Sequence, residues 1–520
     1  MWIKTSQNNS KNKLIRELRR ILSFKRFVIF ILCFSFIVGL VAHKAIHSYD
    51  LTQLKNKYFA LYLHKLGVKI DPISIDIKFK DYQKLEYKRA VTLSAGTKGL
   101  RPILFSTDDD YVKAKIRYQN KNYKIKMRLK GDWADHIANR QWSFRVKIRD
   151  DKSLFGMNRF SLNAAHTRNY LYEWMYYKIL ANEELIALRS RFVKVTLNGK
   201  CLGIYALEEH FSKELIENNR HREGPIIKFS EDVFWEQAWG GRLSKLQLLD
   251  NGEVFLQNTS EIMPFGYNKI LSNPIQYSYF LAARNLLEGF RLGQIPASQV
   301  FDKSKMSRFI VLSQIMGAWH ALRWHNLRFY YNPITRLIEP IGYDGSSGKV
   351  ISDYILKHSS FSVEGQRKLG YTFYHYLFKD KVFLNEYIKV SQELTKKEYL
   401  DDFFNNIENE NHINLSHPRI FDRIYRRDFY VFSKSRFYTN QNVLSSFVDN
   451  GVEKESVVTY KNAKGQKKVA ISEKEKINWL IQLRWNVHKI KNHLKEDKLL
   501  VIKQIKTSLK LLIGLGMLLT

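Results

Sequence analysis

Residues 112–119 and 123–131 read VKAKIRYQ and YKIKMRLKG, in which apolar and charged side chains alternate. Residues 73–80, ISIDIKFK, repeat the same pattern. Alternation with a period of two places one set of side chains in a core and the other set in water, as in a half-buried β-strand. The first part of the chain is therefore predicted to be rich in sheet.

Working outward, the pattern changes twice along the chain. Asn198-Gly199, the dipeptide typical of a type I′ turn, separates two further alternating runs and predicts a hairpin. Before it, residues 169–184 carry apolar side chains at helical spacing. From about 275 to 445 the spacing is mostly helical and is interrupted by one strand-turn-strand segment at 326–345. The sequence thus predicts a sheet-rich first half and a helix-rich second half.

The composition excludes several classes of protein. Of 520 residues, 45% are hydrophobic and 14% are aromatic, so the chain can bury a large core and is not a low-complexity or disordered protein. Lysine and arginine number 85 against 50 acidic residues, a net charge of +35. This excess is either spread over a solvated surface or serves an anionic partner. The two cysteines, Cys33 and Cys201, exclude a disulfide framework.

A long apolar segment lies near the N-terminus. Residues 27–42 read FVIFILCFSFIVGLVA, and apolar neighbours extend the segment towards the roughly 20 residues that span a bilayer. We expect an uncleaved anchor, since the apolar region of a signal peptide is shorter. Eight basic residues and one acid precede the segment, a charge bias typical of the cytoplasmic side. The prediction is a single-pass membrane protein with a cytoplasmic N-terminus and an extracytoplasmic body, periplasmic or lumenal.

The strongest group of candidate functional residues lies in residues 317–348, GAWHALRWHNLRFYYNPITRLIEPIGYDGSSG. An Asn-Pro turn separates two apolar runs, so Asn326 and Asp344 are expected at the same end of a hairpin. An amide oxygen and a carboxylate suit a magnesium ion that keeps several waters and bridges phosphate oxygens. The alternative interpretation is a hairpin with a polar cap and an Asp-Gly turn.

A second group surrounds a predicted strand, QWSFRVKIRD, at residues 141–150. Alternation places Arg145 and Lys147 on one face of this strand, from which a cation can reach a phosphate. Glu173, on the helix that follows, can pair with either cation, as a glutamate pairs with the phosphate-binding lysine of kinases. Gly131 follows a strand and would let backbone N–H groups approach a phosphate. The alternative for the charged residues is an ordinary exposed surface.

Five segments in this order resemble the CotH kinase family, the spore-coat protein H-like atypical kinases. They are RLKGDWADHIANRQWSFRVKI (128–148), SLFGMNRFSLNAAHTRNYLYEWMYYKIL (153–180), RFVKVTLNGKCLGIYALEEHF (191–211), PIIKF (225–229) and HNLRFYYNPITRLIEPIGYDG (325–345). The resemblance covers about residues 75–350. It implies an α+β, two-lobed atypical protein-kinase-like fold, and an enzyme that uses ATP and Mg²⁺ or Mn²⁺ to phosphorylate protein side chains.

The resemblance also implies roles for single residues. Lys147 or Arg145 would hold phosphates, and Glu173 would position that cation. Asn326 and Asp344 would bind the metal. The remaining candidates for the nucleotide site are Gly131 in the glycine strand, Glu208 or Glu209 near the connection between the lobes, and Lys228 near the nucleotide.

The sequence departs from the family pattern at one position. The family has a catalytic Asp a few residues before the metal-binding asparagine, but here no Asp or Glu lies between Asp302 and Glu339. His320 and His325 occupy that neighbourhood, and a histidine with an ordinary pKa of about 6.5 can accept a hydroxyl proton. Alternatively, the transfer proceeds without a base, because positioning and electrostatics provide most of the catalysis, or the protein is an inactive pseudokinase.

Two functions remain open from the sequence. One is a membrane-anchored CotH-like phosphotransferase with a protein or cell-surface acceptor. The other is an inactive scaffold that binds an anionic polymer or lipid headgroup; the predicted anchor argues against nucleic acid. The predicted parts are a basic cytoplasmic N-terminus (1–26), a transmembrane anchor (27–44), a helical stalk (45–73), a sheet-rich N-lobe (74–232), a linker (233–274), a helix-rich C-lobe (275–445) and a basic helical extension (446–520).

Overall fold

The alternating segments at the start of the chain form a β-hairpin in the computed structural model of the protein. Strand β2 (Val112–Tyr118) pairs with β3 (Lys121–Leu129) in antiparallel register, and Gln119 and Asn120 turn the chain with positive φ. Apolar residues lie opposite one another and are buried, as with Val112 and Met127 or Ala114 and Ile125, while lysines lie opposite lysines on the exposed face, as the alternation predicts. The structure describes residues 51–95, 102–232, 234–235, 257–352, 355, 372–413, 415 and 432–449.

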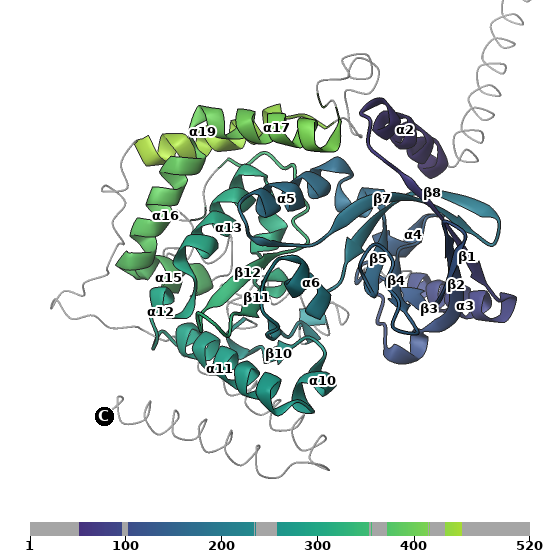
Figure 1. The fold of residues 1–520 in the computed structure, drawn as a ribbon, viewed down its shortest axis with the longest axis horizontal. Helices are drawn as coiled ribbons and strands as arrows, with labels where there is room; N and C mark the ends of the chain where they lie inside the picture. The colour runs from purple at the N-terminus through teal and green to yellow at the C-terminus, as the bar shows by residue number, and fades with distance from the viewer. Residues whose placement is uncertain are drawn as a thin grey trace, which may run out of the picture. The chain divides into compact units, whose positions relative to one another are not determined.

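Seven strands close into a barrel in the order β1-β2-β3-β4-β5-β8-β7 (Figure 1). The other five strands are β1 (Asp71–Ile77), β4 (Phe144–Ile148), β5 (Arg159–Ala164), β7 (Ser190–Leu197) and β8 (Lys200–Glu209). Neighbours are antiparallel except at the seam, where β1 pairs with β7 in parallel and Asp71 lies opposite Val193. The barrel is filled by aliphatic and aromatic side chains that form a hydrophobic core of their own.

A five-stranded sheet of order β10-β9-β11-β12-β6 forms the second layer of structure. Its strands are β6 (Ile186–Ala187), β9 (Ile226–Phe229), β10 (Ile262–Pro264), β11 (Arg328–Tyr331) and β12 (Ile338–Gly342). Strands β11 and β12 are the hairpin predicted around the Asn-Pro turn. β6 pairs in parallel with β12 and precedes the barrel strand β7 in the chain, so this short segment connects the two sheets.

Helices surround the second sheet and supply most of a second, larger hydrophobic core. α13 packs on β12, on α5 and on α16, while α11 packs on β9, β10 and β11. The helices are α2 (Leu51–Lys65), α3 (Phe79–Ser94), α4 (Asp135–Ala138), α5 (Leu171–Asn182), α6 (Lys213–Asn218), α10 (Tyr267–Leu271), α11 (Pro274–Arg291), α12 (Ala297–Val300), α13 (Lys303–Ile315), α15 (Thr372–Lys379), α16 (Lys381–Leu394), α17 (Lys397–Asn411) and α19 (Ser435–Asp449), with short 3-10 turns η2 (Asp108–Asp110), η3 (Ala165–Arg168), η4 (Trp319–Leu322) and η5 (Trp324–Asn326).

The predicted two-lobed kinase-like fold is wrong. The sheet-rich segment closes into a seven-stranded barrel, and the helix-rich segment carries a five-stranded sheet that includes β6 from the first half of the chain. The seam of the barrel joins residues about 120 positions apart. Alternation shows which face of a strand is buried, but it contains no information about which distant strand lies alongside.

The predicted transmembrane helix is corrected as well. Among the described residues, no helix is long and apolar enough to cross a membrane. The longest of them, α11, has 18 residues and carries Arg284, Glu288 and Arg291. The single-pass membrane location therefore finds no support, and residues 27–44, on which it rested, lie outside the described residues. The predicted extension at 446–520 lies outside them too, apart from the end of α19.

Candidate functional site

A pocket of about 130 Å³ lies where the barrel meets the end of strand β12. Its wall comes from β3 and the loop after it, from β4, from the turn after β5 and from the segment after β12. The polar and charged residues in this wall are Ser106, Arg128, Lys130, Asp132, His136, Arg145, Arg168, Tyr343 and Asp344. Segments that are far apart in the sequence thus bring four cations and two carboxylates to one place.

Lys130 and Arg168 are the two deeply buried cations of the pocket. The Lys130 side chain is 8% exposed, and its ammonium donates a hydrogen bond to Asn163 Oδ1 at 2.9 Å. Burial and the nearby positive charge of Arg168 lower the pKa of Lys130 to about 7, although Glu208 opposes the shift. A buried amine whose pKa lies near 7 is only partly protonated, and it gains a proton when an anion such as a phosphate binds beside it.

Arg168 connects two carboxylates from different sheets. Its Nε lies 2.8 Å from Glu208 Oε2 on β8, and its Nη1 lies 2.8 Å from Asp344 Oδ1 after β12. Burial would raise the pKa of Asp344, but the charge of Arg168 and the hydrogen bond to His320 hold it well below its usual value. For Glu208, burial is likewise outweighed by Arg168 and Lys130, which lower its pKa. Both carboxylates therefore stay ionised.

Gly131 lines the pocket at a position that has no space for a side chain. Its φ is +120°, and a Cβ at this position would come within 2.3 Å of the His136 ring. Burial, with the charges of Lys130 and Arg168, lowers the pKa of His136 well below its usual value, so the ring is neutral. Glycine is therefore required at position 131, because the neutral His136 ring occupies the space that a side chain would fill.

The hairpin β11-β12 holds the predicted metal ligands near one histidine. Asn326 Nδ2 lies 3.0 Å from His320 Nδ1, and the same ring nitrogen lies 2.9 Å from the carbonyl oxygen of Asp344. Asn326 and Asp344 thus flank His320. Among the described residues, no cluster of three or more His, Cys, Asp or Glu side chains is arranged to hold a metal. An amide and an ionised carboxylate still fit a magnesium ion whose other ligands are waters and phosphate oxygens.

Neither histidine that was considered as the base is well suited to accept a proton. His325 is buried and stacks on Phe234 at 4.7 Å, and burial lowers its pKa to about 3. His320 has the opposite difficulty. Burial would lower its pKa, but the hydrogen bond to Asp344 and the charge of Asp344 outweigh burial and raise it. His320 therefore tends to hold its own proton.

Glu173 binds the backbone after Asp344 and does not pair with Lys147 or Arg145. Its carboxylate accepts hydrogen bonds from the N–H groups of Gly345 at 2.7 Å and Ser347 at 3.2 Å. The sequence suggested that a cation pairs with Glu173. In the structure the glutamate that pairs with cations is Glu208, which contacts Arg168 and Lys130. Glu173 is a positioning residue for the segment that carries Asp344.

Of the other predicted residues, one lines the pocket and the rest lie outside it. Arg145 lines the pocket and donates a hydrogen bond to His210 Nδ1 at 2.7 Å. Lys147 lies outside the pocket, where its ammonium pairs with exposed Asp108 at 3.2 Å. Lys228 pairs with Glu231 at 3.5 Å, and Glu209 binds Arg189. Lys147, Lys228 and Glu209 do not line the pocket.

Sequence reasoning missed Lys130, Asp132 and Arg168. Lys130 and Asp132 flank the glycine that was singled out, so the run Lys-Gly-Asp after a strand was an available signal. No signal in the sequence pointed to Arg168, because it lies in a short 3-10 turn and its partners are 40 and 176 residues away along the chain. Its importance follows only from the position of its guanidinium between the two carboxylates.

Comparison with known proteins identifies the family of the chain. No curated protein matches the chain significantly. The family described as CotH kinase protein matches residues 127–452, which is more than half of the chain and contains the pocket residues from Arg128 to Asp344. The protein therefore belongs to the CotH kinase family.

Proposed function

We propose that this protein is an ATP- and divalent-metal-dependent phosphotransferase that phosphorylates a hydroxyl group of a protein or cell-surface acceptor. Membership of the CotH kinase family supports a kinase-type function. The observation that carries the proposal is the convergence of Arg128, Lys130, Arg145 and Arg168 on one pocket. Stabilising negative charge on phosphoryl oxygens requires such a set of preorganised cations.

The size of the pocket matches the phosphate end of a nucleotide. A volume of about 130 Å³ is below the roughly 300–1,000 Å³ of pockets that enclose whole small molecules. In this proposal the phosphates enter the pocket and contact Lys130, Arg145 and the backbone at Gly131. The nucleoside lies outside it.

Asp344 and Asn326 are the residues that would hold the divalent metal. Asp344 remains ionised, and both residues contact His320. A bound metal neutralises negative charge on the phosphoryl group during transfer. Glu173, through its hydrogen bonds to Gly345 and Ser347, orients the segment on which Asp344 lies.

Asp132 is the best candidate in the pocket for accepting the proton of the acceptor hydroxyl. It lies on the loop after β3, lines the pocket and is exposed to solvent. Partial removal from water raises its pKa to about 6, and the charges of Glu231 and Asp344 add to the shift. A carboxylate with this pKa is mostly ionised at neutral pH and is a better base than an ordinary aspartate. Asp132 would thereby replace the acid that is missing before Asn326.

The test is calorimetric titration of the full chain with ATP in the presence of Mg²⁺ or Mn²⁺. Two lysine variants form a matched pair. Lys130→Ala removes a pocket cation, and Lys147→Ala removes a cation on β4 that does not line the pocket. We expect Lys130→Ala and Asp344→Asn to weaken binding at least tenfold, since charge-assisted hydrogen bonds contribute roughly 1.5–3 kcal/mol each. Lys147→Ala should bind like the wild type; equal loss in both lysine variants would contradict this pocket as the phosphate site.

A second function, an inactive scaffold that binds an anionic polymer, is favoured by one observation. Arg168 already forms an ion pair with Asp344 at 2.8 Å, so a metal has to compete with a guanidinium. No acid lies between Asp302 and Glu339 to act as the family's base. Failure of the folded wild type to bind ATP with either metal would support the scaffold over the enzyme.

A further inference from the structure

Basic side chains lie directly opposite one another across the outer face of the barrel. In one row, Lys113 on β2 pairs with Lys126 on β3, Lys126 pairs with Lys147 on β4, and Lys147 pairs with Arg159 on β5. Beside this row, Lys115 lies opposite Lys124, and on its other side Arg128 lies opposite Arg145. We call these eight residues the basic face: Lys113, Lys115, Lys124, Lys126, Arg128, Arg145, Lys147 and Arg159.

This arrangement is unfavourable for the folded protein on its own. Like charges directly opposite each other in a sheet destabilise it. The compensating acids on this side are few: Asp76 pairs with Arg117, Asp150 with Lys124, and Asp108 with Lys147. Lys113, Lys115 and Lys126 are exposed and form no ion pair with any residue in the part of the chain that the structure describes. An anionic partner would remove the repulsion between them.

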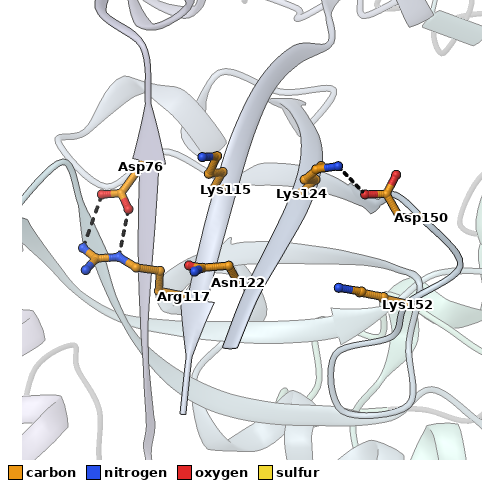
Figure 2. Close-up of a pocket in the computed structure, with 7 residues that line it drawn as sticks. All are labelled: Asp76, Lys115, Arg117, Asn122, Lys124, Asp150 and Lys152. Atoms are coloured by element: carbon orange, nitrogen blue, oxygen red, sulfur yellow. Dashed lines mark hydrogen bonds and ion pairs between the residues drawn. The ribbon is translucent and has the colours of Figure 1, made fainter. Parts of the chain in front are cut away.

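The basic face is continuous with the candidate site. Arg128 and Arg145 line the pocket, and Lys126 and Lys147 are the next outward-facing residues on the same two strands. Farther along, Lys115 on β2 and Lys124 on β3 line a second pocket of about 420 Å³, and Figure 2 shows Lys124 turned towards Asp150. A chain that lies along β3 over this face would therefore reach the pocket.

We propose that the basic face binds an extended acidic polypeptide, and that this polypeptide is the acceptor. The identification as acceptor rests on the proposed phosphotransferase function. Outward side chains on a strand recur every two residues, about 6.6–6.8 Å apart, and alternate acidic side chains on an extended peptide repeat at the same distance. The outward positions of β2 and β3 carry lysine, arginine and asparagine and no aromatic residue. Tyr111, just before β2, already has Lys147 at 4.2 Å and Arg128 at 5.3 Å from its ring centre, so this face offers little surface for stacking nucleic-acid bases.

The experiment measures binding of a fluorescent peptide of about twelve residues in which glutamate alternates with serine, long enough to cross the basic face. The test variant is Lys113→Thr/Lys115→Thr/Lys126→Thr. A matched control, Lys69→Thr/Lys194→Thr/Lys200→Thr, removes the same charge from exposed lysines elsewhere on this part of the chain. We expect the test variant to bind about tenfold more weakly at low ionic strength, with the difference shrinking as salt is added, while the control binds like the wild type.

Two further measurements separate the possible outcomes. The test variant should have a higher unfolding temperature than the wild type at low salt, because repulsion between opposed lysines is lost. Equal weakening in test and control variants, or tighter binding of heparin or polyuridylate than of the peptide, would overturn the proposal.

Peptide binding and nucleotide binding are tested independently. Asp344→Asn should lose ATP binding and keep peptide binding, since the peptide contacts lysines outside the pocket. If the wild type binds the peptide through these lysines but does not bind ATP, the phosphotransferase fails and the basic face stands as a docking surface. If ATP binds and the test variant retains full peptide affinity, the basic face fails alone.

Discussion

At the scale of single residues, burial sets the charge states in the candidate site. Glu173 is 2% exposed and is surrounded by Arg168, Asp344 and Glu208. Burial raises its pKa to about 7, and Asp344 and Glu208 add to the shift, although Arg168 opposes it. Its hydrogen bonds to two backbone N–H groups explain why an acid is retained at such a position.

We predict that Glu173→Gln gains stability relative to the wild type as pH rises. Because the folded-state pKa of about 7 lies above the ordinary value of 4.5, the folded wild type binds more protons between these values and loses stability as pH rises through them. Glutamine keeps an acceptor and does not titrate. The difference in unfolding free energy should shift by up to about 3 kcal/mol in favour of the variant from pH 4.5 to 7. Denaturant titrations across this range test the prediction, and a constant difference would contradict it.

Lys130 gives a second prediction at this scale. Because burial lowers its pKa to about 7, the amine is largely neutral at pH 8. Bound phosphates would restore the charge, so ATP binding at pH 8 should take up a proton, at most about one per site. Calorimetry in two buffers with different ionisation enthalpies measures this uptake. Lys130→Ala should abolish it and Lys147→Ala should not; unchanged uptake in Lys130→Ala would assign the proton to another group.

At the scale of elements, one turn residue secures the seam of the barrel. Asn198, between β7 and β8, accepts a hydrogen bond from Ile77 N at 2.8 Å and donates one to Ile77 O at 3.0 Å. Its φ of +47° belongs to the left-handed region that asparagine and glycine tolerate. The turn between two adjacent strands therefore also binds β1, the strand that closes the barrel.

We predict that Asn198→Gly lowers the free energy of unfolding by about 2 kcal/mol, the sum of two side-chain hydrogen bonds. Glycine keeps the left-handed backbone accessible, so this loss measures the bonds to β1 alone. Asn198→Ala should lose about 1 kcal/mol more, because its Cβ is strained at this φ. Denaturant unfolding gives both values, and faster amide exchange at Ile77 should accompany them. Equal stability of Asn198→Gly and the wild type would show that the seam does not depend on this side chain.

At the scale of the whole described unit, Arg168 links two hydrophobic cores. It follows β5 of the barrel, binds Glu208 on β8 and reaches Asp344 at the end of the second sheet. The parallel pairing of β6 with β12 brings the same two regions together through the backbone. The site and the connection between the cores therefore share the same residues.

We predict that Arg168→Met lowers the free energy of unfolding by about 3 kcal/mol at pH 7, because it leaves Asp344 without its guanidinium partner and leaves Glu208 with only the weaker Lys130 contact at 3.8 Å. Arg168 lowers the pKa of Asp344 and Glu208 in the folded state, so the stability it provides is present at neutral pH and is lost as pH falls towards the folded-state values. The deficit should therefore shrink in acid.

The double variant Arg168→Met/Asp344→Asn serves as the control, since it removes one of the orphaned charges. It should recover part of the stability lost in Arg168→Met. A deficit that is independent of pH and is not reduced in the double variant would show that Arg168 acts through packing and not through its charge.

Local patterns were sufficient for strands β1 to β4, the β7-β8 hairpin with its Asn198-Gly199 turn, helix α5 and the β11-β12 hairpin, because alternation, helical spacing and turn chemistry act over a few residues. The family segments led in the same way to Gly131, Arg145 and Asp344, which line the pocket. Tertiary structure alone decided that the strands close into a barrel, that Lys130 and not Lys147 is the buried cation, and where Arg168 lies. These features depend on which distant segments meet and on how far each charge is removed from water, and neither is encoded in the spacing of residues along one strand or helix.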